Sequence, residues 1–310
     1  MIALIPFFET PVWDLGFMPL DSWALLVTLA FILGLEVGRA RAIKLGLDIR
    51  DIYDGGLFTV GMGFFVGHII HVIPYNMQML EEEGWIVLLR VWRGFSSTGG
   101  FIGALIGSII FMKLIRKRSW WVHADVIMFA FPFGYIFGRL GCFTAHDHIG
   151  IESTSFIAVD YPQPGTEECA ALQNPYFCVG PRLDMALLEA LWLGVICTVF
   201  FLLRNRKMPI GSYLAIWCLM YSPMRLVLDN FRNRDLVGAD VRYLGLTPAQ
   251  YWALTTFALG LVLLTYLRKK PIVVEDEVIV IDTPGESSGE ASPVAEPETD
   301  SESDSDPEAV

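Results

Sequence analysis

The sequence predicts an all-α membrane protein that crosses the bilayer seven times and carries a small extracytoplasmic cap. Of the 310 residues, 54% are hydrophobic, and the mean hydropathy of +0.49 is higher than a soluble domain normally reaches. Several apolar runs approach the roughly 20 residues that an α-helix needs to cross a bilayer. Basic residues follow every second run, so the chain has a regular charge asymmetry.

The expected helices occupy residues 22–38, 57–73, 99–115, 120–143, 183–203, 211–228 and 248–267. Basic runs follow the first, third, fifth and seventh of them, at residues 39–44, 116–118, 204–207 and 268–270. Because basic loops are retained in the cytoplasm, odd-numbered helices run inward and even-numbered helices run outward. The pattern predicts an N-terminus outside the cell and a cytoplasmic C-terminus.

Two connections between the helices are long enough to form structure of their own. Residues 75–98 contain the run WIVLLRVW, with Arg90 and Arg93, which is typical of a helix lying flat on the membrane surface. Residues 144–181 are polar, and we expect them to form the extracytoplasmic cap. Cys169 and Cys178 share this cap, and the sequence leaves open whether they form a disulfide there.

The net charge of −12 comes from the C-terminal tail. Residues 271–310 contain 13 acidic and no basic residues, so residues 1–270 carry a formal charge of only +1. Such a tail buries too little apolar surface to fold, and we expect it to be disordered. The chain therefore divides into a membrane domain, residues 1–270, and an acidic cytoplasmic tail, with no indication of a nucleic-acid partner.

The first charged cluster lies where the fourth helix meets the cap, in the run FPFGYIFGRLGCFTAHDHIG. Arg139 keeps its charge in hydrocarbon at a cost of roughly 3 kcal/mol or more, so it needs an anion nearby. His146, Asp147 and His148 follow within three turns. We expect this segment to bind a phosphate at the outer membrane face; the alternative is an arginine that reaches the interface or pairs with a structural carboxylate.

The second cluster lies in the sixth helix, in the run YSPMRLVLDNFR. Tyr221, Arg225, Asp229 and Arg232 recur at helical spacing and share one face. Three arginines from the two clusters face two carboxylates, those of Asp147 and Asp229. A surplus positive charge at low dielectric favours an external anion, whereas a purely structural network remains the alternative.

Glycines recur at four-residue spacing in three of the expected helices, which is typical of helices that pack closely in lipid. These pairs are Gly63 and Gly67, Gly103 and Gly107, and Gly134 and Gly138. Gly99 and Gly100 differ because they begin the third helix. Exposed amide groups at a helix N-terminus suit a phosphate, so these two glycines are further candidates for anion binding.

With both clusters in view, the chain resembles the prolipoprotein diacylglyceryl transferase family. The runs GGFIGALIGSIIFMK and PFGYIFGRLGCF are similar to that family's signature, a Gly-Gly helix start followed by P-x-G-x-x-x-G-R-x-G-N-F. The sixth helix is similar to the family's Y-x-x-x-R-x-x-x-E-x-x-R. The run RARAIKLGLDIRDIYD resembles its first cytoplasmic loop, and Gln250 falls at a family glutamine. The resemblance covers most of residues 20–270.

The resemblance implies an enzyme of the bacterial inner membrane that needs no cofactor. Such an enzyme moves the diacylglyceryl group of phosphatidylglycerol to the lipobox cysteine of a prolipoprotein signal peptide. The family's essential arginines, tyrosine, second arginine, two glutamates and loop glycine correspond here to Arg139, Arg225, Tyr221, Arg232, Asp147, Asp229 and Gly150.

The chain departs from the family at several positions. Cys142 replaces the signature asparagine, Thr98 replaces the histidine before the glycine pair, and Trp23 replaces a tyrosine. His68 falls near a family arginine, and the family run His-Pro-Ser-Gln-Leu-Tyr-Glu is barely recognisable at residues 179–185. Anion-binding residues are better kept than proton carriers, which leaves a non-catalytic relative that binds anionic phospholipid or lipoprotein signal peptides as an alternative.

In the implied reaction a thiolate attacks the C3 carbon of the lipid glycerol, and glycerol-1-phosphate leaves. Fixed guanidinium groups stabilise the charge that develops on the leaving phosphate. This role falls to Arg139 and Arg225, with Tyr221, Arg232 and the amides of Gly99 and Gly100 nearby.

The attacking thiol has a free pKa of about 8.5 and must lose a proton. The candidate bases are His146, His148, His68 and Asp229, among which the sequence does not choose. Asp147 and Asp229 are more suited to orienting arginines. No set of His, Cys and acidic residues has convincing metal-ligand spacing, so no metal is expected. A small-anion transporter is a third hypothesis, although no broken helix pair or internal repeat supports it.

Overall fold

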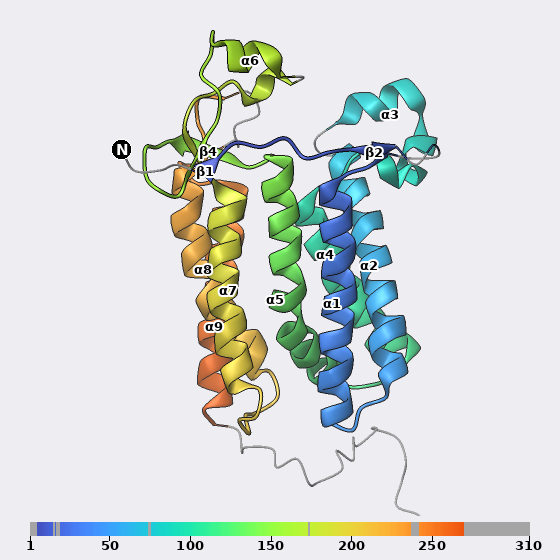
Figure 1. Ribbon diagram of the computed structural model, residues 1–310. Helices are drawn as coiled ribbons and strands as arrows, with labels where there is room; N and C mark the ends of the chain where they lie inside the picture. Colours follow the sequence, from blue (N-terminus) through green and yellow to red (C-terminus); the bar gives the residue numbers. More distant parts are fainter. Residues whose placement is uncertain are drawn as a thin grey trace, which may run out of the picture. The chain divides into compact units, whose positions relative to one another are not determined.

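Seven long α-helices run side by side in the part of the chain that the structure describes (Figure 1). This computed structural model describes residues 5–14, 16, 19–73, 76–172, 174–236 and 242–269. The long helices are α1 (Ser22–Lys44), α2 (Ile49–Val72), α4 (Ser97–Ile110), α5 (Trp120–Ala145), α7 (Met185–Leu203), α8 (Ser212–Leu228) and α9 (Pro248–Leu267). The predicted disordered tail, residues 271–310, lies outside the described residues.

Six of these helices are long and apolar enough to cross a membrane, with α4 continued by the π-helical turn η3 (Phe111–Ile115). A polytopic helical membrane fold is therefore confirmed. The seventh predicted span corresponds to α8, which has 17 residues and continues into the 3₁₀ turn η5 (Asp229–Phe231). Seventeen residues lie at the short end of the range that spans a bilayer.

Side-chain caps set where several helices begin. The carboxylate of Asp21 accepts a hydrogen bond from the Ala24 amide at the start of α1, and Thr247 and Gln250 form a reciprocal capping box at the start of α9. Helix α8 has no such cap of its own. Instead, Asp125 on α5 accepts a 2.9 Å hydrogen bond from the Tyr213 amide, so α5 supplies the N-terminal cap of α8.

Helix α5 is central because it packs against α1, α7 and α8, while α2 pairs with α4 and α8 with α9. Glycines permit the closest approaches. A Cβ atom at Gly134 on α5 would lie 2.4 Å from the Ala30 carbonyl oxygen on α1, and one at Gly103 on α4 would lie 2.5 Å from the Met62 carbonyl oxygen on α2. These contacts agree with the packing role that the four-residue glycine spacing predicts.

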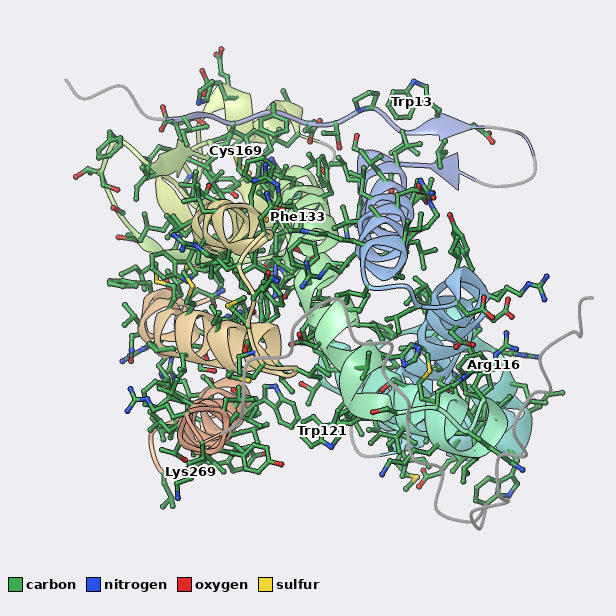
Figure 2. All side chains as sticks on the ribbon, turned by 90° about the horizontal axis from the view of Figure 1, so that it is seen from below. Trp13, Arg116, Trp121, Phe133, Cys169 and Lys269 are labelled. Carbon is green, nitrogen blue, oxygen red and sulfur yellow. A yellow bond between two sulfur atoms is a disulfide. The ribbon has the colours of Figure 1, made fainter. Side chains whose placement is uncertain are left out.

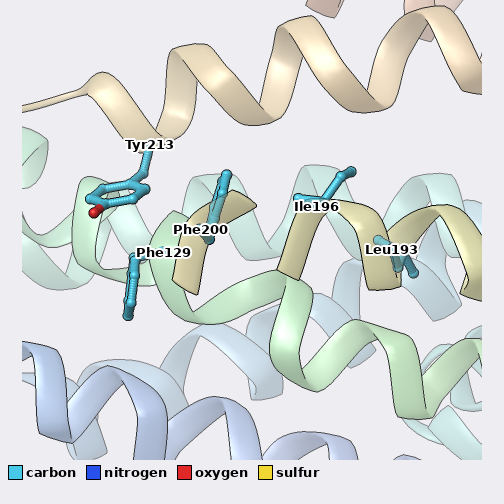
Figure 3. Packing of buried hydrophobic residues seen from close by; sticks show 5 residues of the cluster. All are labelled: Phe129, Leu193, Ile196, Phe200 and Tyr213. Carbon is cyan, nitrogen blue, oxygen red and sulfur yellow. The ribbon is translucent and has the colours of Figure 1, made fainter. Parts of the chain in front are cut away.

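A buried apolar cluster joins α5, α7 and α8 (Figure 3). It contains Phe129, Leu193, Ile196, Phe200 and Tyr213. The ring centroids of Phe129 and Tyr213 lie 4.9 Å apart in an edge-on arrangement. Lipid tails are as apolar as these side chains, so close van der Waals packing rather than exclusion of water holds the helices together here.

The basic runs gather at one end of the helices, and Figure 2 views the protein from this end. Arg41 at the end of α1 donates a 2.9 Å hydrogen bond to the Arg204 carbonyl oxygen at the end of α7. Arg116, after α4, lies 3.1 Å from the buried carboxylate of Asp51 at the start of α2. Both contacts join neighbouring helices at the same end.

The opposite end carries a small cap that contains a four-stranded sheet in the order β1-β5-β6-β4. Its strands are β1 (Ile5–Pro6), β4 (Ile149–Glu152), β5 (Ala158–Asp160) and β6 (Arg182–Asp184). Only the β1–β5 pair is parallel. The expectation of an all-α chain missed this sheet because strands of two to four residues are too short to show an alternating pattern.

Further short elements complete the cap end. A second pair of strands, β2 (Trp13–Asp14) and β3 (Pro19–Leu20), precedes α1. After β5 come the short helix α6 (Glu167–Ala171) and the 3₁₀ turn η4 (Pro175–Phe177). A disulfide joins Cys169 to Cys178 across these two elements, which answers the question that the sequence left open.

The prediction of one helix lying flat at residues 75–98 is wrong. The structure divides this segment into α3 (Met77–Glu83) and the 3₁₀ turns η1 (Trp85–Leu89) and η2 (Val91–Arg93). Gly84 and Gly94 have φ angles of +70° and +137°, which an α-helix cannot contain. Arg90 and Arg93 both pair with Glu83, at 2.6 and 2.5 Å.

Arg182 holds the cap sheet together. Its side chain is buried, donates a 3.1 Å hydrogen bond to the Gly150 carbonyl oxygen, and pairs with both Asp235 and Glu152. The hydrogen bond from Arg182 lowers the pKa of Asp235. The guanidinium therefore ties strand β6 to strand β4 and to the segment after α8.

Replacing Asp235 with asparagine should lower the melting temperature in detergent at pH 7 by a few degrees at most, because the Asp235 side chain is 54% exposed. A lowered pKa stabilises the fold above the unfolded value of about 3.9, and this contribution is lost as the pH falls through the folded pKa. The gap between variant and native melting temperatures should therefore close in acid. A gap of constant size across the whole pH range would contradict this role.

Candidate active site

Arg139 and Arg225 come from different helices and meet at one buried carboxylate, that of Glu189 on α7. The Arg139 Nε atom lies 3.2 Å from Glu189 Oε2, and the Arg225 Nη1 atom lies 2.9 Å from the same oxygen. The Glu189 residue is 2% exposed. The two predicted essential arginines are thus brought together from α5 and α8, and α7 supplies the charge that holds them side by side.

A tyrosine stands four residues before each arginine and joins the same network. The Tyr135 hydroxyl accepts a 2.9 Å hydrogen bond from Arg139 Nε, and the Tyr221 hydroxyl donates to Glu189 Oε1. The two hydroxyl oxygens lie 3.4 Å apart. Each Y-x-x-x-R run therefore places its tyrosine and arginine on one helix face, and the two faces meet at Glu189.

Aromatic rings pack against this network. The ring of Trp217 stacks on Tyr221 at a centroid distance of 4.6 Å, and that of Phe131 stacks on Tyr135 at 4.9 Å. Such rings limit the access of water, and at low dielectric the interactions of the arginines with an anion become stronger.

A second buried carboxylate, that of Asp229, orients the arginines of α8 and its C-terminal turn. Asp229 Oδ1 lies 3.2 Å from both Arg225 Nη2 and Arg232 Nε. Its other oxygen accepts a hydrogen bond from the hydroxyl of Thr247, the N-cap of α9. Because one oxygen lies between two guanidinium groups and the other accepts from Thr247, Asp229 suits a positioning role rather than the catalytic base that the sequence also allowed.

Glu189 adds a carboxylate that the sequence count of charges did not include. Three guanidinium groups, those of Arg139, Arg225 and Arg232, face the buried carboxylates of Glu189 and Asp229, and Asp147 lies beside Arg139 through His148. The predicted surplus of positive charge is therefore wrong, because the formal charges of these six side chains are equal in number. What favours a phosphate is the planar guanidinium groups of Arg139 and Arg225, which suit bidentate contacts to it.

The structure does not place His146 with the arginines, which corrects the expectation of a catalytic role. Its ring nitrogens lie 3.0 Å from the Tyr161 hydroxyl and 3.0 Å from the Phe8 carbonyl oxygen, inside the cap. Burial and the neighbouring Asp184 carboxylate raise the pKa of Tyr161, so this hydroxyl keeps its proton. His146 ends α5 in a left-handed conformation and fixes the cap on the helix.

The ring of His68 also contacts other parts of the protein, which corrects the expectation that it is a candidate base. It is fully buried, and its two ring nitrogens each lie 2.8 Å from a carbonyl oxygen, those of Gly94 and Val87. A carbonyl oxygen only accepts hydrogen bonds and a neutral imidazole carries one N–H, so the ring donates to one of these oxygens and lies against the other. The ring therefore ties the turns η1 and η2 to α2.

The glycine pair at the start of α4 does not form the predicted phosphate cradle. The Gly99 amide donates to the Ser96 hydroxyl at 3.4 Å, and the Gly100 amide donates to the Ser96 carbonyl oxygen at 2.8 Å. A Cβ at Gly99 would lie 2.8 Å from the Ile70 side chain. Gly99 is therefore needed for packing on α2, whereas a Cβ at Gly100 would lie 2.4 Å from the Phe95 ring. Thr98 beside them is exposed.

Gly150 has a structural reason to be glycine. A Cβ atom at this position would lie 2.7 Å from the Phe231 carbonyl oxygen and 2.9 Å from that of Leu183. Its backbone also forms an isolated β-bridge with Arg232. The cap therefore closes directly on the turn that carries the third arginine.

Asp147, His148 and Cys142 gather beside Arg139. A ring nitrogen of His148, Nδ1, contacts the Asp147 carboxylate, and the other, Nε2, lies 3.4 Å from Arg139 Nη1. One potential ligand atom from each of the three residues lies within 4.8 Å of the others, a grouping that the sequence analysis did not anticipate. A guanidinium in contact with the same imidazole opposes a metal cation here.

Sequence reasoning missed Glu189 and Tyr135. An acidic residue within an apolar span is a functional candidate from the sequence alone, and Glu189 is the one carboxylate between residues 185 and 203. Tyr135 repeats the spacing of Tyr221, four residues before an arginine. Both signals were present in the printed sequence.

Comparison with known proteins supports a specific family. The family model described as prolipoprotein diacylglyceryl transferase matches residues 11–266. A protein of Escherichia coli strain K12 / DH10B named phosphatidylglycerol–prolipoprotein diacylglyceryl transferase is 28% identical over 283 residues, 86% of this chain and 95% of the relative. A protein of the same name from Shigella boydii serotype 18 matches with the same identity and coverage.

Replacing Glu189 with glutamine should destabilise the protein by about 3–5 kcal/mol, because it leaves two guanidinium groups buried side by side without their shared carboxylate. Unfolding of the purified protein in detergent measures this loss. The matched control is Glu152→Gln, whose side chain is 78% exposed and whose change should stay below about 1 kcal/mol. Equal stability of the Glu189 variant and the native protein would show that the arginines do not depend on this carboxylate.

Proposed function

The chain belongs to the prolipoprotein diacylglyceryl transferase family, and we propose that it transfers the diacylglyceryl group of phosphatidylglycerol to the cysteine thiol of prolipoproteins. The observation that carries this proposal is the convergence of Arg139 and Arg225 on Glu189. It supplies two fixed guanidinium groups, from two helices, at one place where a lipid phosphate can bind.

The chemistry requires stabilisation of a leaving phosphate. The substrate thiolate attacks the C3 carbon of the lipid glycerol, the carbon–oxygen bond to phosphate breaks, and glycerol-1-phosphate leaves with the electron pair. Charge on that phosphate grows during the step. Guanidinium groups that are already in position stabilise the growing charge without having to reorganise. We assign this role to Arg139 and Arg225.

The other members of the network act through these two arginines. Glu189 holds the two guanidinium groups side by side, and Asp229 holds Arg225 from the other direction. The hydroxyl groups of Tyr135 and Tyr221 fill the remaining hydrogen-bond positions on Glu189. A phosphate that binds beside the two arginines finds their guanidinium groups already oriented. This lowers the entropy cost of ordering the site when the lipid binds.

The site suits the outer face of the inner membrane, where a prolipoprotein cysteine would arrive. The cap holds a disulfide, and disulfides persist in oxidising compartments outside the cytoplasm. The basic runs lie at the opposite end of the helices, as expected for a cytoplasmic face. Both observations support a chain that crosses the membrane seven times with its C-terminus in the cytoplasm.

Replacing Arg139 or Arg225 with alanine should reduce transfer by at least about 10²-fold, the usual cost of removing one preorganised donor. Lysine at either position should restore the charge but not the bidentate geometry, and therefore only part of the activity. Mass spectrometry of a lipobox peptide, incubated with the protein and phosphatidylglycerol vesicles, measures the transfer.

The matched control is Arg204→Ala, because Arg204 lies at the other end of the helices and donates to its own helix at Phe201. This variant should retain its activity. Membrane insertion of every variant is checked by its recovery from the membrane fraction. Full activity of the Arg139 or Arg225 variants would contradict the phosphate role, and a native protein without any transfer would favour the non-catalytic alternative.

A further inference from the structure

We propose that His148, oriented by Asp147, is the general base that takes the proton from the substrate thiol. This inference rests on the proposed function and adds a residue that the resemblance to the family does not supply. It stands on the geometry of the His148 ring, on how its backbone is held, and on its position beside Arg139.

The two ring nitrogens of His148 have different partners, which fixes the proton on one of them. Nδ1 contacts the carboxylate of Asp147, which accepts hydrogen bonds. Nε2 lies 3.4 Å from Nη1 of Arg139, which only donates. The proton therefore sits on Nδ1, and the lone pair of Nε2 faces Arg139, which has to release this lone pair before a thiol can donate to it. This is the tautomer that a base held by a carboxylate requires.

The backbone of His148 is held on both sides. Its carbonyl oxygen accepts a 2.9 Å hydrogen bond from the amide of Met185, the first residue of α7. The next residue, Ile149, pairs with Asp184 in the cap sheet. On the other side, the buried ring of His146 ties the end of α5 to the cap. The imidazole is therefore placed by α5, β4 and α7 rather than by a free loop.

Four charged or titratable groups surround the imidazole. Asp147 and Arg139 contact it directly, and Cys142 and Glu189 lie close to it. Arg139 is shared between the base and the network that binds the phosphate. A thiol that approaches Nε2 is therefore separated from the leaving phosphate only by the guanidinium group of Arg139. The proton is then removed close to the carbon that the sulfur attacks, as the reaction requires.

The other histidines of the chain are engaged elsewhere. All of the five histidines lie in the described residues. His68 and His146 are buried inside the protein, whereas 23% of the His148 side chain is exposed. His123 pairs with Asp51 near the basic end of the helices. His71 contacts Asn76 after α2. Because Thr98 cannot replace the family's histidine as a base, His148 is the imidazole with the required position.

In the proposed step one proton and one diacylglyceryl group change partners. Nε2 of His148 takes the thiol proton and becomes part of an imidazolium. The carboxylate of Asp147 stabilises this cation, and the phosphate that Arg139 binds offsets the neighbouring guanidinium charge. The thiolate sulfur forms a bond to the glycerol C3 carbon, and the bond from that carbon to the phosphate oxygen breaks. Glycerol-1-phosphate leaves with the electron pair, and the imidazolium returns its proton to the phosphate or to water. No oxidant, reductant or cofactor takes part.

The test compares two lipobox peptides that differ only in the nucleophile, cysteine or selenocysteine, under reducing conditions at pH 7. A selenol is already ionised at this pH and needs no base. With the cysteine peptide, His148→Gln should lower kcat by about 10²–10⁴-fold, the usual contribution of a general base. With the selenocysteine peptide it should remain within a few-fold of the native protein. Equal losses with both peptides would overturn the proposal, since a structural role affects both nucleophiles alike.

Control variants separate this proposal from the proposed function. Arg139→Ala should lose activity with both peptides, because the leaving group is the same. Asp147→Asn should show the same preference for selenocysteine as the His148 variant, with a smaller loss. If the native protein transfers to neither peptide, the proposed function fails. If the native protein is active and the His148→Gln variant has the same kcat with the cysteine peptide, only the assignment of His148 as the base fails.

Two further measurements test the assignment. The cysteine activity of His148→Gln should recover as the pH rises toward the thiol value of about 8.5, because the substrate then ionises without help. Loss of native activity in a chelator, restored by zinc, would instead make Cys142, Asp147 and His148 a metal site and overturn the proposal.

Discussion

The charge of a guanidinium group in hydrocarbon is the constraint on which this structure depends. Arginine cannot lose its proton under these conditions, so a charge placed inside a membrane helix has to be balanced by a neighbour. Glu189 supplies that neighbour for Arg139 and Arg225 at once. The carboxylate holds the two groups together, and Asp229 contacts Arg225 from the other direction.

The same constraint explains how the helices around the site are joined. α5, α7 and α8 each contribute at least one member of the network, so their relative position fixes its geometry. Helix α9 joins through Thr247, which caps its own helix and donates to Asp229. The capping box and the ion network share one side chain, so the start of α9 and the orientation of Arg225 are linked.

Most of the membrane helices and both arginines were predictable from the sequence, because hydropathy and charge asymmetry are strong signals in a bilayer. The convergence of Arg139 and Arg225 was not predictable, because the sequence of one helix does not specify which neighbouring helix it packs against. The roles of His146 and His68 were also beyond reach. Their ring partners, such as the Phe8 carbonyl oxygen 138 residues away, depend on the folded cap.

The residues that bind the phosphate are more tightly constrained in position than the residue that removes the proton. This difference accounts for where the chain departs from its family. Phosphate binding needs two guanidinium groups on two helices at one distance, so neither Arg139 nor Arg225 can move along its helix. A general base needs only to reach the thiol with one lone pair. It can therefore be supplied by another segment, so Thr98 in the first turn of α4 is compatible with a base at His148, beside Arg139. On this view, the loss of a proton carrier at one position is not evidence against catalysis until the residues around the anion site have been searched for its replacement.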